Sequence, residues 1–486
     1  TYITLNKSEK EVEDFISKYP RRTKQIEILK RLLIESKILK SEFTHQVVNI
    51  LLEENLIKIE KEQIYRLNNN NIINESITFT KEQENAISSV SLQEENTYLL
   101  HGVTGSGKTE VYIELIKRVV ASGKTAIMLV PEISLTAQIV NKFYNRFGDD
   151  VAIFHSGLSD GEKYDEYLKI LRGEVHIVVG TRSAIFTPLT NLGIIIIDEE
   201  HSDTYKQDSN PRYHAIDMAI FRSKYYKIPL ILGSATPSLE SMARALKGVY
   251  KYIEMPSRVG ASVLPKVKLV DMTEEMKKRN TIFSDELKEK MLDRLSKNEQ
   301  TILLLNRRGY STVISCKSCG YTYECPYCDI TLTYHKSSNN LRCHYCGYTI
   351  FKGEECPECN EKALTDYGLG TEKLEQELSK LLPTARIIRM DADTTRNKGA
   401  HEDIINRFKN HEYDILLGTQ MISKGLNFPL VTLVGVINAD ATLNIPDFRS
   451  GERTFSLLSQ VAGRAGRSEL PGEVILQTFN PDNFTL

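Results

Sequence analysis

The sequence has no cysteine outside one short segment, no excess of charge of either sign and no long apolar run. Its 62 Lys and Arg residues nearly match its 64 Asp and Glu residues, which gives a formal net charge of −2. This balance excludes a histone-like protein or a polybasic tail, but a basic groove on a neutral chain can still bind nucleic acid. The longest apolar run, residues 192–197, fits a buried strand. It is far shorter than the roughly 18 residues that span a bilayer, so we expect no membrane partner.

The chain begins with Thr1-Tyr2-Ile3 and has neither an initiator Met nor the basic leader and apolar stretch of a signal peptide. We therefore expect a piece of a longer, cytoplasmic protein. Its 486 residues suggest about three domains.

Residues 1–75 are predicted to form a winged-helix domain. Helical periodicity recurs there three times, at 11–16, 23–33 and 43–54. Ser41 is placed to cap the third helix, and two short strand patterns follow at 56–59 and 63–66. Three helices and a hairpin make a winged-helix pattern, and a generic helical module is the alternative.

Residues 76–247 alternate apolar strands with amphipathic helices, which predicts an α/β lobe with a parallel sheet. Its expected strands are 97–100, 126–130, 151–154, 175–180, 194–197 and 230–233. Residues 248–298 are predicted to be an irregular connector with a helix near its end. A second α/β lobe comprises 299–314 and 362–486, with expected strands 301–305, 386–390, 414–417, 431–438 and 472–477. Residues 315–361 interrupt this lobe as a cysteine-rich insertion.

A phosphate-binding loop is predicted where Gly102-Val-Thr-Gly105-Ser106-Gly107-Lys108-Thr109 follows a strand and opens a helix. Gly102, Gly105 and Gly107, with Ser106 between the last two, would let backbone N–H groups close on phosphates. The Lys108 ammonium would neutralise β- and γ-phosphate oxygens, and the Thr109 hydroxyl would ligate Mg²⁺. A chance glycine-rich turn is the alternative, and the flanking strand and helix argue against it.

Three acidic residues and a histidine follow the apolar run directly, in the order Asp198-Glu199-Glu200-His201. Carboxylates at the carboxyl end of a strand face the ligand crevice of an open α/β sheet. Asp198 would hold Mg²⁺, and Glu199 would orient or deprotonate the attacking water. A solvated acidic loop is the alternative, and the phosphate loop upstream argues against it.

The segment after these acids is polar, aromatic and basic; it contains Tyr205, Lys206, Arg212 and Tyr213. Because this segment follows the acidic residues directly, the effect of a nucleic-acid contact there could be transmitted to Glu199. A surface excursion with an incidental tyrosine pair is the alternative.

All eight cysteines lie in four C-x-x-C pairs, which indicates metal binding in a reducing compartment rather than a disulfide framework. Two pairs are separated by 14 residues, near the usual zinc-ribbon interval of about 15–20. The first predicted Zn²⁺ site therefore uses Cys325, Cys328, Cys343 and Cys346. The remaining thiols make the second site: Cys316, Cys319, Cys356 and Cys359. Both sites are filled by four thiolates, so the zinc is expected to be structural; iron–sulfur clusters are the alternative.

Tyrosines interleave with basic residues in this insertion, at 321, 323, 327, 334, 345 and 348. They could stack on unpaired bases, or they could pack a small domain that has little core. His335 and His344 are expected at the surface, because eight thiolates already fill both sites.

The order of further motifs resembles superfamily 2 helicases. These motifs are Thr80-Lys-Glu-Gln83, the phosphate loop, Pro131-Glu-Ile-Ser-Leu-Thr136, Gly180-Thr-Arg-Ser183, Asp198-Glu-Glu-His201, Gly233-Ser-Ala-Thr-Pro237, Gly418-Thr-Gln-Met421 and Gln460-Val-Ala-Gly-Arg464-Ala-Gly-Arg467. The resemblance implies two RecA-like lobes with ATP bound between them, and Gln83 reading adenine. Arg467 is the first candidate for an arginine finger and Arg464 the second, with Gln460 beside them. Surface ion pairs are the alternative for both arginines.

A narrower set of segments resembles the primosomal replication-restart DNA helicases, the PriA family (primosomal protein N′). These segments are Leu129-Val-Pro-Glu-Ile-Ser-Leu-Thr136, Arg307-Arg-Gly-Tyr310, Gly368-Leu-Gly-Thr-Glu372, Arg389-Met-Asp-Ala-Asp-Thr394 and Ile422-Ser-Lys-Gly425. This resemblance implies the same zinc pairing, Gly425 in the nucleotide site and a loop at 205–213 that couples DNA binding to hydrolysis. It also implies an N-terminal DNA-binding domain and a further C-terminal domain, to which nothing here corresponds. In motif V, the resemblance implies a polar pair that ends in Asp, whereas this sequence has Leu426-Asn427. We expect this departure to leave nucleotide hydrolysis intact and to alter its coupling.

The activity implied by this family is ATP-dependent 3′-to-5′ DNA unwinding at stalled or branched forks, in replication restart and primosome assembly. Forked and single-stranded DNA, single-strand-binding protein and replicative helicase-loading proteins are the implied partners, in a nucleoid-associated bacterial setting. Two alternatives remain open. The chain could be an assembly scaffold at forks in which hydrolysis is secondary, or it could be an RNA helicase.

Overall fold

The computed structural model describes residues 2–61, 65–66, 78–131, 133–260, 264–278, 282–305, 314–316, 318–328, 330–335, 338–366, 371–391, 393–395, 399–423, 428–466 and 470–486. The chain divides into two compact units, Thr1–Asn68 and Asn69–Leu486. Among the described residues, no helix combines the length and the apolar character that a membrane span requires.

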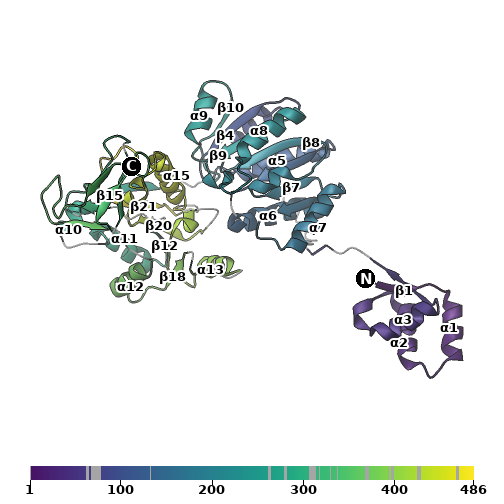
Figure 1. The fold of residues 1–486 in the computed structure, drawn as a ribbon. Coiled ribbons are helices and arrows are strands. Elements are labelled where there is room, and N and C mark those ends of the chain that lie inside the picture. Colours follow the sequence, from purple (N-terminus) through teal and green to yellow (C-terminus); the bar gives the residue numbers. More distant parts are fainter. Residues whose placement is uncertain are drawn as a thin grey trace. The chain divides into compact units, whose positions relative to one another are not determined.

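The first unit packs three helices on a three-stranded antiparallel sheet of order β2-β1-β3 (Figure 1). Its elements are β1 (Tyr2–Leu5), α1 (Glu9–Lys18), α2 (Thr23–Glu35), β2 (Lys37–Leu39), the 3₁₀ turn η1 (Lys40–Glu42), α3 (His45–Glu53) and β3 (Ile57–Glu60). The three predicted helices and the first predicted strand are present, and β1 and β2 are additional. Residues 63–64 of the second predicted strand lie outside the described residues, so the winged-helix assignment stays a prediction.

The prediction that Ser41 caps α3 is wrong. Ser41 lies inside η1, and the N-cap of α3 is Thr44. The 3₁₀ turn is followed by extended backbone at Phe43, with φ −126° and ψ 155°, so the helix begins only at His45. An N-cap residue must directly precede the first helical turn, and Ser41 is three residues too early.

In the second unit, the first lobe is a seven-stranded parallel sheet of order β10-β4-β9-β8-β5-β7-β6, covered by helices on both faces (Figure 1). The strands are β4 (Thr97–Gly102), β5 (Thr125–Leu129), β6 (Val151–Phe154), β7 (Ile177–Gly180), β8 (Leu192–Asp198), β9 (Leu230–Ser234) and β10 (Lys251–Met255). The helices are α4 (Lys81–Ser89), α5 (Lys108–Ala121), α6 (Ile133–Phe147), α7 (Asp160–Leu171), α8 (Ala215–Tyr226) and α9 (Leu239–Leu246), with the 3₁₀ turns η2 (Gly148–Asp150), η3 (Arg182–Phe186) and η4 (Asp203–Tyr205).

Strand β8 shows why the apolar run reads as a buried strand. Ile194 and Ile196 point into the core that contains α4, α5 and α6, whereas Ile195 and Ile197 point into the core that contains α7, α8 and α9. A parallel strand covered on both faces must be apolar at every position. The strand ends at Asp198, its first acidic residue, at the carboxyl ends of the parallel strands.

The second lobe is a six-stranded parallel sheet of order β11-β21-β20-β12-β19-β18. Its strands are β11 (Lys266–Asp271), β12 (Gln300–Leu304), β18 (Ile387–Met390), β19 (Ile415–Gly418), β20 (Val431–Val436) and β21 (Glu473–Thr478). Its helices are α10 (Met272–Lys277), α11 (Asp285–Ser296), α12 (Thr371–Leu381), α13 (Ala400–Lys409), α14 (Asp440–Leu443) and α15 (Ser450–Ala462), with the 3₁₀ turn η5 (Gln420–Ser423).

Residues 248–298 are not an irregular connector. They contain the predicted helix, α11, but also β10, which pairs with β4, and β11, which pairs with β21. Both are edge strands. Only Ile253 and Met255 of β10 and only Val270 of β11 are buried. An edge strand with so few apolar residues and several lysines lacks the continuous apolar signal of a central strand.

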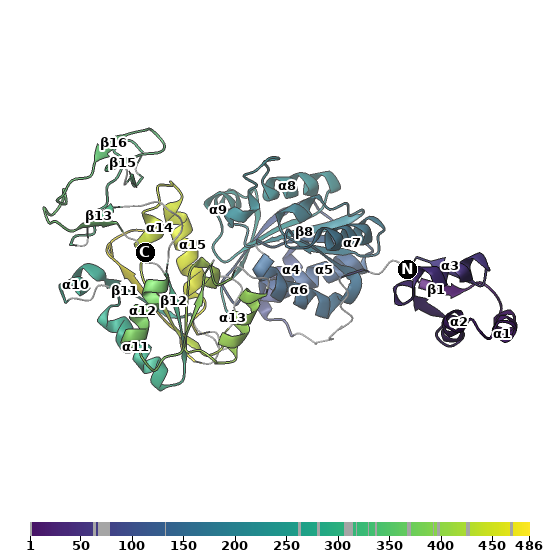
Figure 2. The ribbon, with the colours of Figure 1, turned by 60° about the horizontal axis from the view of Figure 1, so that its bottom comes forward.

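The cysteine-rich insertion consists of short strands and loops outside the six-stranded sheet (Figure 2). Strands β13 (Ile314–Cys316) and β17 (Leu364–Asp366) pair with each other, and β14 (Thr333–His335), β15 (Asn340–Arg342) and β16 (Thr349–Phe351) form a three-stranded sheet. Its small core contains four of the eight cysteines, together with Tyr323, Leu332 and Leu341.

We expect the Met255→Ala variant to lower the free energy of unfolding by about 2–5 kcal/mol, because Met255 is fully buried in the first lobe. Lys251→Ala is the matched control, since Lys251 is exposed on the same strand; it should change stability by no more than about 0.5 kcal/mol. Urea unfolding followed by circular dichroism measures both. Equal midpoints for the two variants would mean that β10 contributes nothing to the lobe.

Candidate nucleotide site and metal centres

The predicted phosphate loop lies between β4 and α5. Gly105 and Gly107 have φ values of 90° and 83°, in the left-handed region that glycine adopts without strain. Gly107 is the N-cap of α5, so the loop delivers backbone N–H groups at a helix N-terminus. A Cβ atom on Gly107 would lie 2.1 Å from Gln83 Nε2, and one on Gly102 would lie 2.6 Å from Ser106 Oγ. Position 107 therefore needs glycine for conformation as well as for space, whereas at Gly102 the constraint is space alone.

Lys108 Nζ donates a hydrogen bond to the Gly102 carbonyl oxygen at 2.6 Å, which holds the ammonium over the loop. Thr109 is the next residue of α5 and is half-buried. Both residues lie where the phosphate-binding prediction puts them. Their contacts with nucleotide and Mg²⁺ stay predictions.

Gln83 is buried against the phosphate loop. Its Oε1 accepts a hydrogen bond from Thr80 N at 2.8 Å, which closes the capping box of α4. Its Nε2 donates to the carbonyl oxygens of Ser106 and Gly107, both at 3.4 Å. The side chain thus supports the loop directly, and adenine recognition by Gln83 stays a prediction.

Asp198 ends β8 next to this loop. Its Oδ1 accepts a hydrogen bond from Tyr112 Oη at 3.0 Å. Burial, together with the nearby charge of Glu199, raises the pKa of Asp198 to about 6, while the Lys108 ammonium acts in the opposite direction. A bound divalent cation would favour the charged form, so the position suits the predicted Mg²⁺ ligand.

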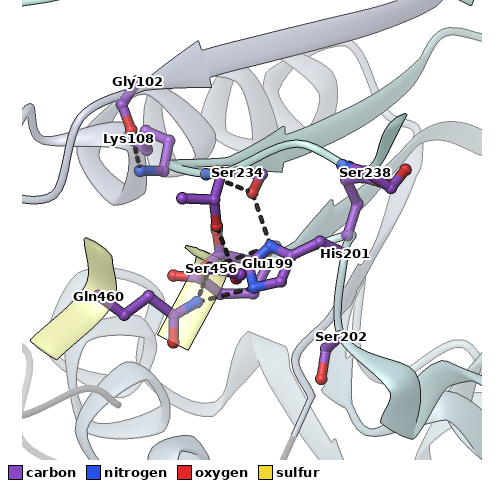
Figure 3. A network of polar contacts seen from close by, with 12 residues as sticks. Gly102, Lys108, Glu199, His201, Ser202, Ser234, Ser238, Ser456 and Gln460 are labelled. Atoms are coloured by element: carbon purple, nitrogen blue, oxygen red, sulfur yellow. Dashed lines mark hydrogen bonds and ion pairs between the residues drawn. The ribbon is translucent and has the colours of Figure 1, made fainter. Parts of the chain in front are cut away.

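Glu199, Gln460 and His201 form one polar network (Figure 3). Gln460 Nε2 lies 3.3 Å from Glu199 Oε2 and 2.7 Å from His201 Nε2. Because an amide nitrogen only donates, His201 Nε2 accepts this hydrogen bond and the ring proton lies on Nδ1. His201 Nδ1 then donates to Ser234 Oγ at 2.7 Å. His201 therefore links the end of β9 to Gln460 of α15.

The backbone of Glu199 has φ 49°, a left-handed conformation that is costly for a residue with a side chain. It reverses the chain at the carboxyl end of β8, and Glu200 N then donates to the Gly233 carbonyl oxygen at 3.0 Å. The reversal sends neighbouring side chains to different partners. Glu199 faces Gln460, whereas Glu200 accepts from Ser238 N at 2.7 Å and from Ser241 Oγ at 2.9 Å.

Sequence reasoning missed this role of Glu200. Its buried carboxylate anchors the first turn of α9, where a helix N-terminus favours an anion. The available signal was Ser238, a capping residue that directly follows the Thr236-Pro237 motif.

One face of α15 contacts the first lobe along its whole length. The pairs, in chain order, are Arg449 with Glu240, Glu452 with the Leu239 backbone N–H, Arg453 with Asp203, Ser456 with Thr236, and Gln460 with Glu199 and His201. At the helix end, a Cβ atom on Gly463 would lie 2.9 Å from Thr104 Cβ of the phosphate loop. Residues spaced by three or four share a helix face, so α15 docks as a single surface.

The sequence analysis named Gln460 as a site residue but missed Arg449, Glu452, Arg453 and Ser456. Their regular spacing ahead of Gln460 was the available signal. Arg464 is buried just past the end of the helix. Arg467, Gly425, the Leu426-Asn427 pair and residues 307–310 lie outside the described residues, so the finger assignment stays a prediction.

The predicted coupling loop contains one residue that is not at the surface. Tyr205 is fully buried, and its hydroxyl donates to the carbonyl oxygens of Asp198 at 2.6 Å and Leu129 at 3.2 Å. It therefore cannot stack on a base where it lies, but it touches the main chain of the Mg²⁺ candidate directly. Lys206 and Arg212 are exposed.

Arg182 stabilises the start of this loop. Its Nη1 donates to the carbonyl oxygens of Thr204 at 3.2 Å and Lys206 at 2.7 Å. Tyr213 is half-buried and packs edge-on against Phe186 at a centroid distance of 4.8 Å. Of the four predicted loop residues, the structure thus presents two basic side chains to solvent and uses two tyrosines as supports.

The eight cysteines form two clusters with the predicted pairing. Within each set, Cys316, Cys319, Cys356 and Cys359 or Cys325, Cys328, Cys343 and Cys346, all four Sγ atoms lie within 4.8 Å of one another. The Sγ–Sγ distances are 3.6 Å for Cys316–Cys359 and 3.5 Å for Cys325–Cys346. Zn–S bonds of about 2.3 Å in a tetrahedron require about 3.8 Å, so both sets fit Zn²⁺.

The three C-x-x-C knuckles whose following residue the structure describes close in the same way. The residue after the second cysteine has positive φ: 78° at Gly320, 80° at Gly347 and 58° at Asn360. Its N–H donates to the carbonyl oxygen of the first cysteine at 2.9, 3.0 and 2.9 Å respectively. Glycine and asparagine tolerate this conformation, which turns both thiols to one side.

The tyrosines of the insertion divide between the two predicted roles. Tyr323 is buried in its core, and Tyr321, Tyr334 and Tyr348 pack against that core. Tyr327 and Tyr345 are exposed by 76% and 60%, so only these two remain open to an external partner. His335 and His344 belong to neither thiol cluster.

Two RecA-like lobes, a phosphate loop facing acids at a sheet edge and an inserted zinc module define a superfamily 2 helicase core. Family comparisons agree with this class. Residues 80–245 match the DEAD/DEAH box helicase model, residues 360–469 the helicase conserved C-terminal domain, and residues 325–350 the PriA DNA helicase Cys-rich region.

The chain belongs to the PriA family of replication restart proteins. It is 52% identical to replication restart protein PriA of Bacillus subtilis (strain 168), covering 92% of this chain and 56% of that protein. It is 47% identical to the protein of the same name from Synechocystis sp., covering 89% and 54%, and 45% identical to that of Chlamydia muridarum, covering 95% and 62%. The chain thus spans little more than half the length of these relatives.

We expect the Gly107→Ala variant to lose at least about tenfold in ADP affinity, because the new methyl group would displace Gln83 and distort the loop. Gly123→Ala is the matched control. Gly123 has a similar φ of 75° but open space around it, so only a conformational cost of roughly 1 kcal/mol should appear. Isothermal titration with ADP measures binding, and equal affinities in the two variants would contradict the steric role of Gly107.

We expect the purified chain to hold two zinc ions, one for each thiol cluster. Cys343→Ser and Cys359→Ser should each lose one ion, because they remove a ligand from different sites. His344→Ala should keep both ions and is the control. Metal content by inductively coupled plasma mass spectrometry decides this, and iron in place of zinc would overturn the assignment.

Proposed function

We propose that this chain is the motor core of an ATP-dependent DNA helicase that acts at stalled or branched replication forks. Membership of the PriA family supports replication restart as the process in which this chain acts. The observation that carries the motor assignment is the contact of α15 with the carboxyl edge of the first sheet, where Gln460 touches both Glu199 and His201. Groups from the two lobes meet there, next to the predicted phosphate loop.

In the proposed reaction, the phosphate loop binds the triphosphate through backbone N–H groups and Lys108. Mg²⁺, held by Thr109 and Asp198, would neutralise charge on the β- and γ-phosphates. Glu199 would orient the attacking water, and Gln460 positions the Glu199 carboxylate at 3.3 Å. Arg467 or Arg464 would stabilise the charge that develops in the transition state.

Coupling to DNA would run through the segment at 205–213. Tyr205 contacts the Asp198 main chain, while Lys206 and Arg212 face solvent a few residues away. A phosphate backbone bound by the two basic residues would therefore bias the position of the metal ligand. The 3′-to-5′ polarity, single-strand-binding protein and helicase-loading proteins as partners, and a nucleoid-associated location in the bacterial cytoplasm are proposed from the family resemblance.

We expect ATP hydrolysis by this chain to rise at least about tenfold with forked DNA, and less with duplex DNA or single-stranded RNA. Steady-state hydrolysis at about 100 mM salt measures this, since nucleic-acid affinity depends on salt. Lys108→Ala should lower kcat by at least about 100-fold, because it removes charge stabilisation at the phosphates. Lys117→Ala, an exposed lysine on the same helix, is the control and should hydrolyse normally.

The other outcomes separate the alternatives. Greater stimulation by RNA than by forked DNA would favour an RNA helicase. Hydrolysis that no nucleic acid changes, with fork binding retained in Lys108→Ala, would favour the assembly scaffold. Unwinding of forks with only a 3′ or only a 5′ single-stranded arm reports the polarity.

A further inference from the structure

The residues that follow β10 lie directly on the phosphate loop. Val259 N donates to the Gly105 carbonyl oxygen at 3.0 Å, and Ser257 N donates to Glu82 Oε2 at 3.2 Å. Val103 N, at the start of the loop, donates to the Met255 carbonyl oxygen at 3.1 Å. The segment between the two lobes is therefore hydrogen-bonded to both sides of the loop.

Arg258 bridges from this segment to the end of α15. A Cβ atom built on Gly105 would lie 3.6 Å from Arg258 Cγ, so the stem of the arginine crosses the loop. The guanidinium donates from Nη1 to the carbonyl oxygens of Ala465 at 3.3 Å and Gly466 at 3.0 Å, and from Nη2 to that of Gly463 at 3.3 Å. One side chain thus joins the phosphate loop to the residues on both sides of Arg464.

These acceptors suit a guanidinium. They lie at and just beyond the C-terminus of α15, where Gly463 is the C-cap residue and the helix dipole is negative. Arginine offers five N–H donors in a planar fork, whereas lysine is a compact point charge. Burial lowers the pKa of Arg258, and the carbonyl contacts compensate for part of this desolvation.

We infer that Arg258 is a positioning residue for nucleotide hydrolysis. Its side chain fixes the distance between the Gly463–Gly466 turn and the phosphate loop. It acts through Arg464 and the residues that follow it, rather than on the phosphates themselves. This inference rests on the proposed hydrolytic function. Misplacement of a catalytic group by about 1 Å can lower a rate by up to roughly 100-fold.

We expect Arg258→Ala to lower kcat for ATP hydrolysis by about 10- to 100-fold, with KM for ATP changed by less than about threefold. Arg258→Lys should recover only part of kcat, because it keeps the charge but not the fork. Lys251→Ala, an exposed cation on β10, is the control and should match the unmodified chain. A raised KM with unchanged kcat would mean that Arg258 binds phosphate directly, and unchanged kcat would overturn the inference outright.

A second readout does not depend on activity. Hydrogen–deuterium exchange of peptides covering 456–466 should be faster in Arg258→Ala than in Lys251→Ala, while peptides from α7 should exchange equally. Unchanged exchange at 456–466 would overturn the inference even if the chain hydrolyses ATP. Absence of hydrolysis in the unmodified chain would instead contradict the proposed function. The exchange result would still show whether Arg258 holds the turn at the end of α15.

Discussion

The docking of one helix face, that of α15, on the carboxyl edge of the first sheet is the contact on which the chemistry depends. All strands of a parallel sheet end at the same edge, so β4, β8 and β9 bring the phosphate loop, the acids and Ser234 together. The helix meets this edge as a rigid row, from Arg449 to Gly463. Since the contacts share one face, we expect them to form or break together, so that the proposed hydrolysis would couple to lobe movement in discrete states.

Much of this site follows from the sequence because its chemistry needs fixed residue types at fixed spacing. Lys108, Asp198 and the cysteine pairs are of this kind, since backbone N–H cradles, Mg²⁺ and Zn²⁺ restrict their ligands strongly. Parallel strands covered on both faces are equally legible, as the run of isoleucines in β8 illustrates. Edge strands β10 and β11 were missed because they bury few side chains, and Arg258 was missed with them.

Tyr205 shows a different limit of sequence reasoning. An aromatic residue within a polar, basic segment predicts a surface that stacks on bases. The side chain instead turns inward, since its hydroxyl can satisfy two carbonyl oxygens at the ends of β5 and β8. Alternation of polar and apolar residues cannot reveal this, because a buried tyrosine and an exposed one read alike until the acceptors are placed in space.

The connector is part of the catalytic architecture rather than a tether. Its strand β10 belongs to the first sheet and its strand β11 to the second, so any rotation of one lobe against the other acts on the residues between them. Two hydrogen bonds connect this path to the two ends of the phosphate loop. Val103 N donates to the Met255 carbonyl oxygen, and Val259 N donates to the Gly105 carbonyl oxygen. A lobe movement transmitted along this path would change the shape of the loop itself. Nucleotide binding and lobe orientation would therefore be linked through the main chain, as well as through the arginines proposed as fingers in the second lobe.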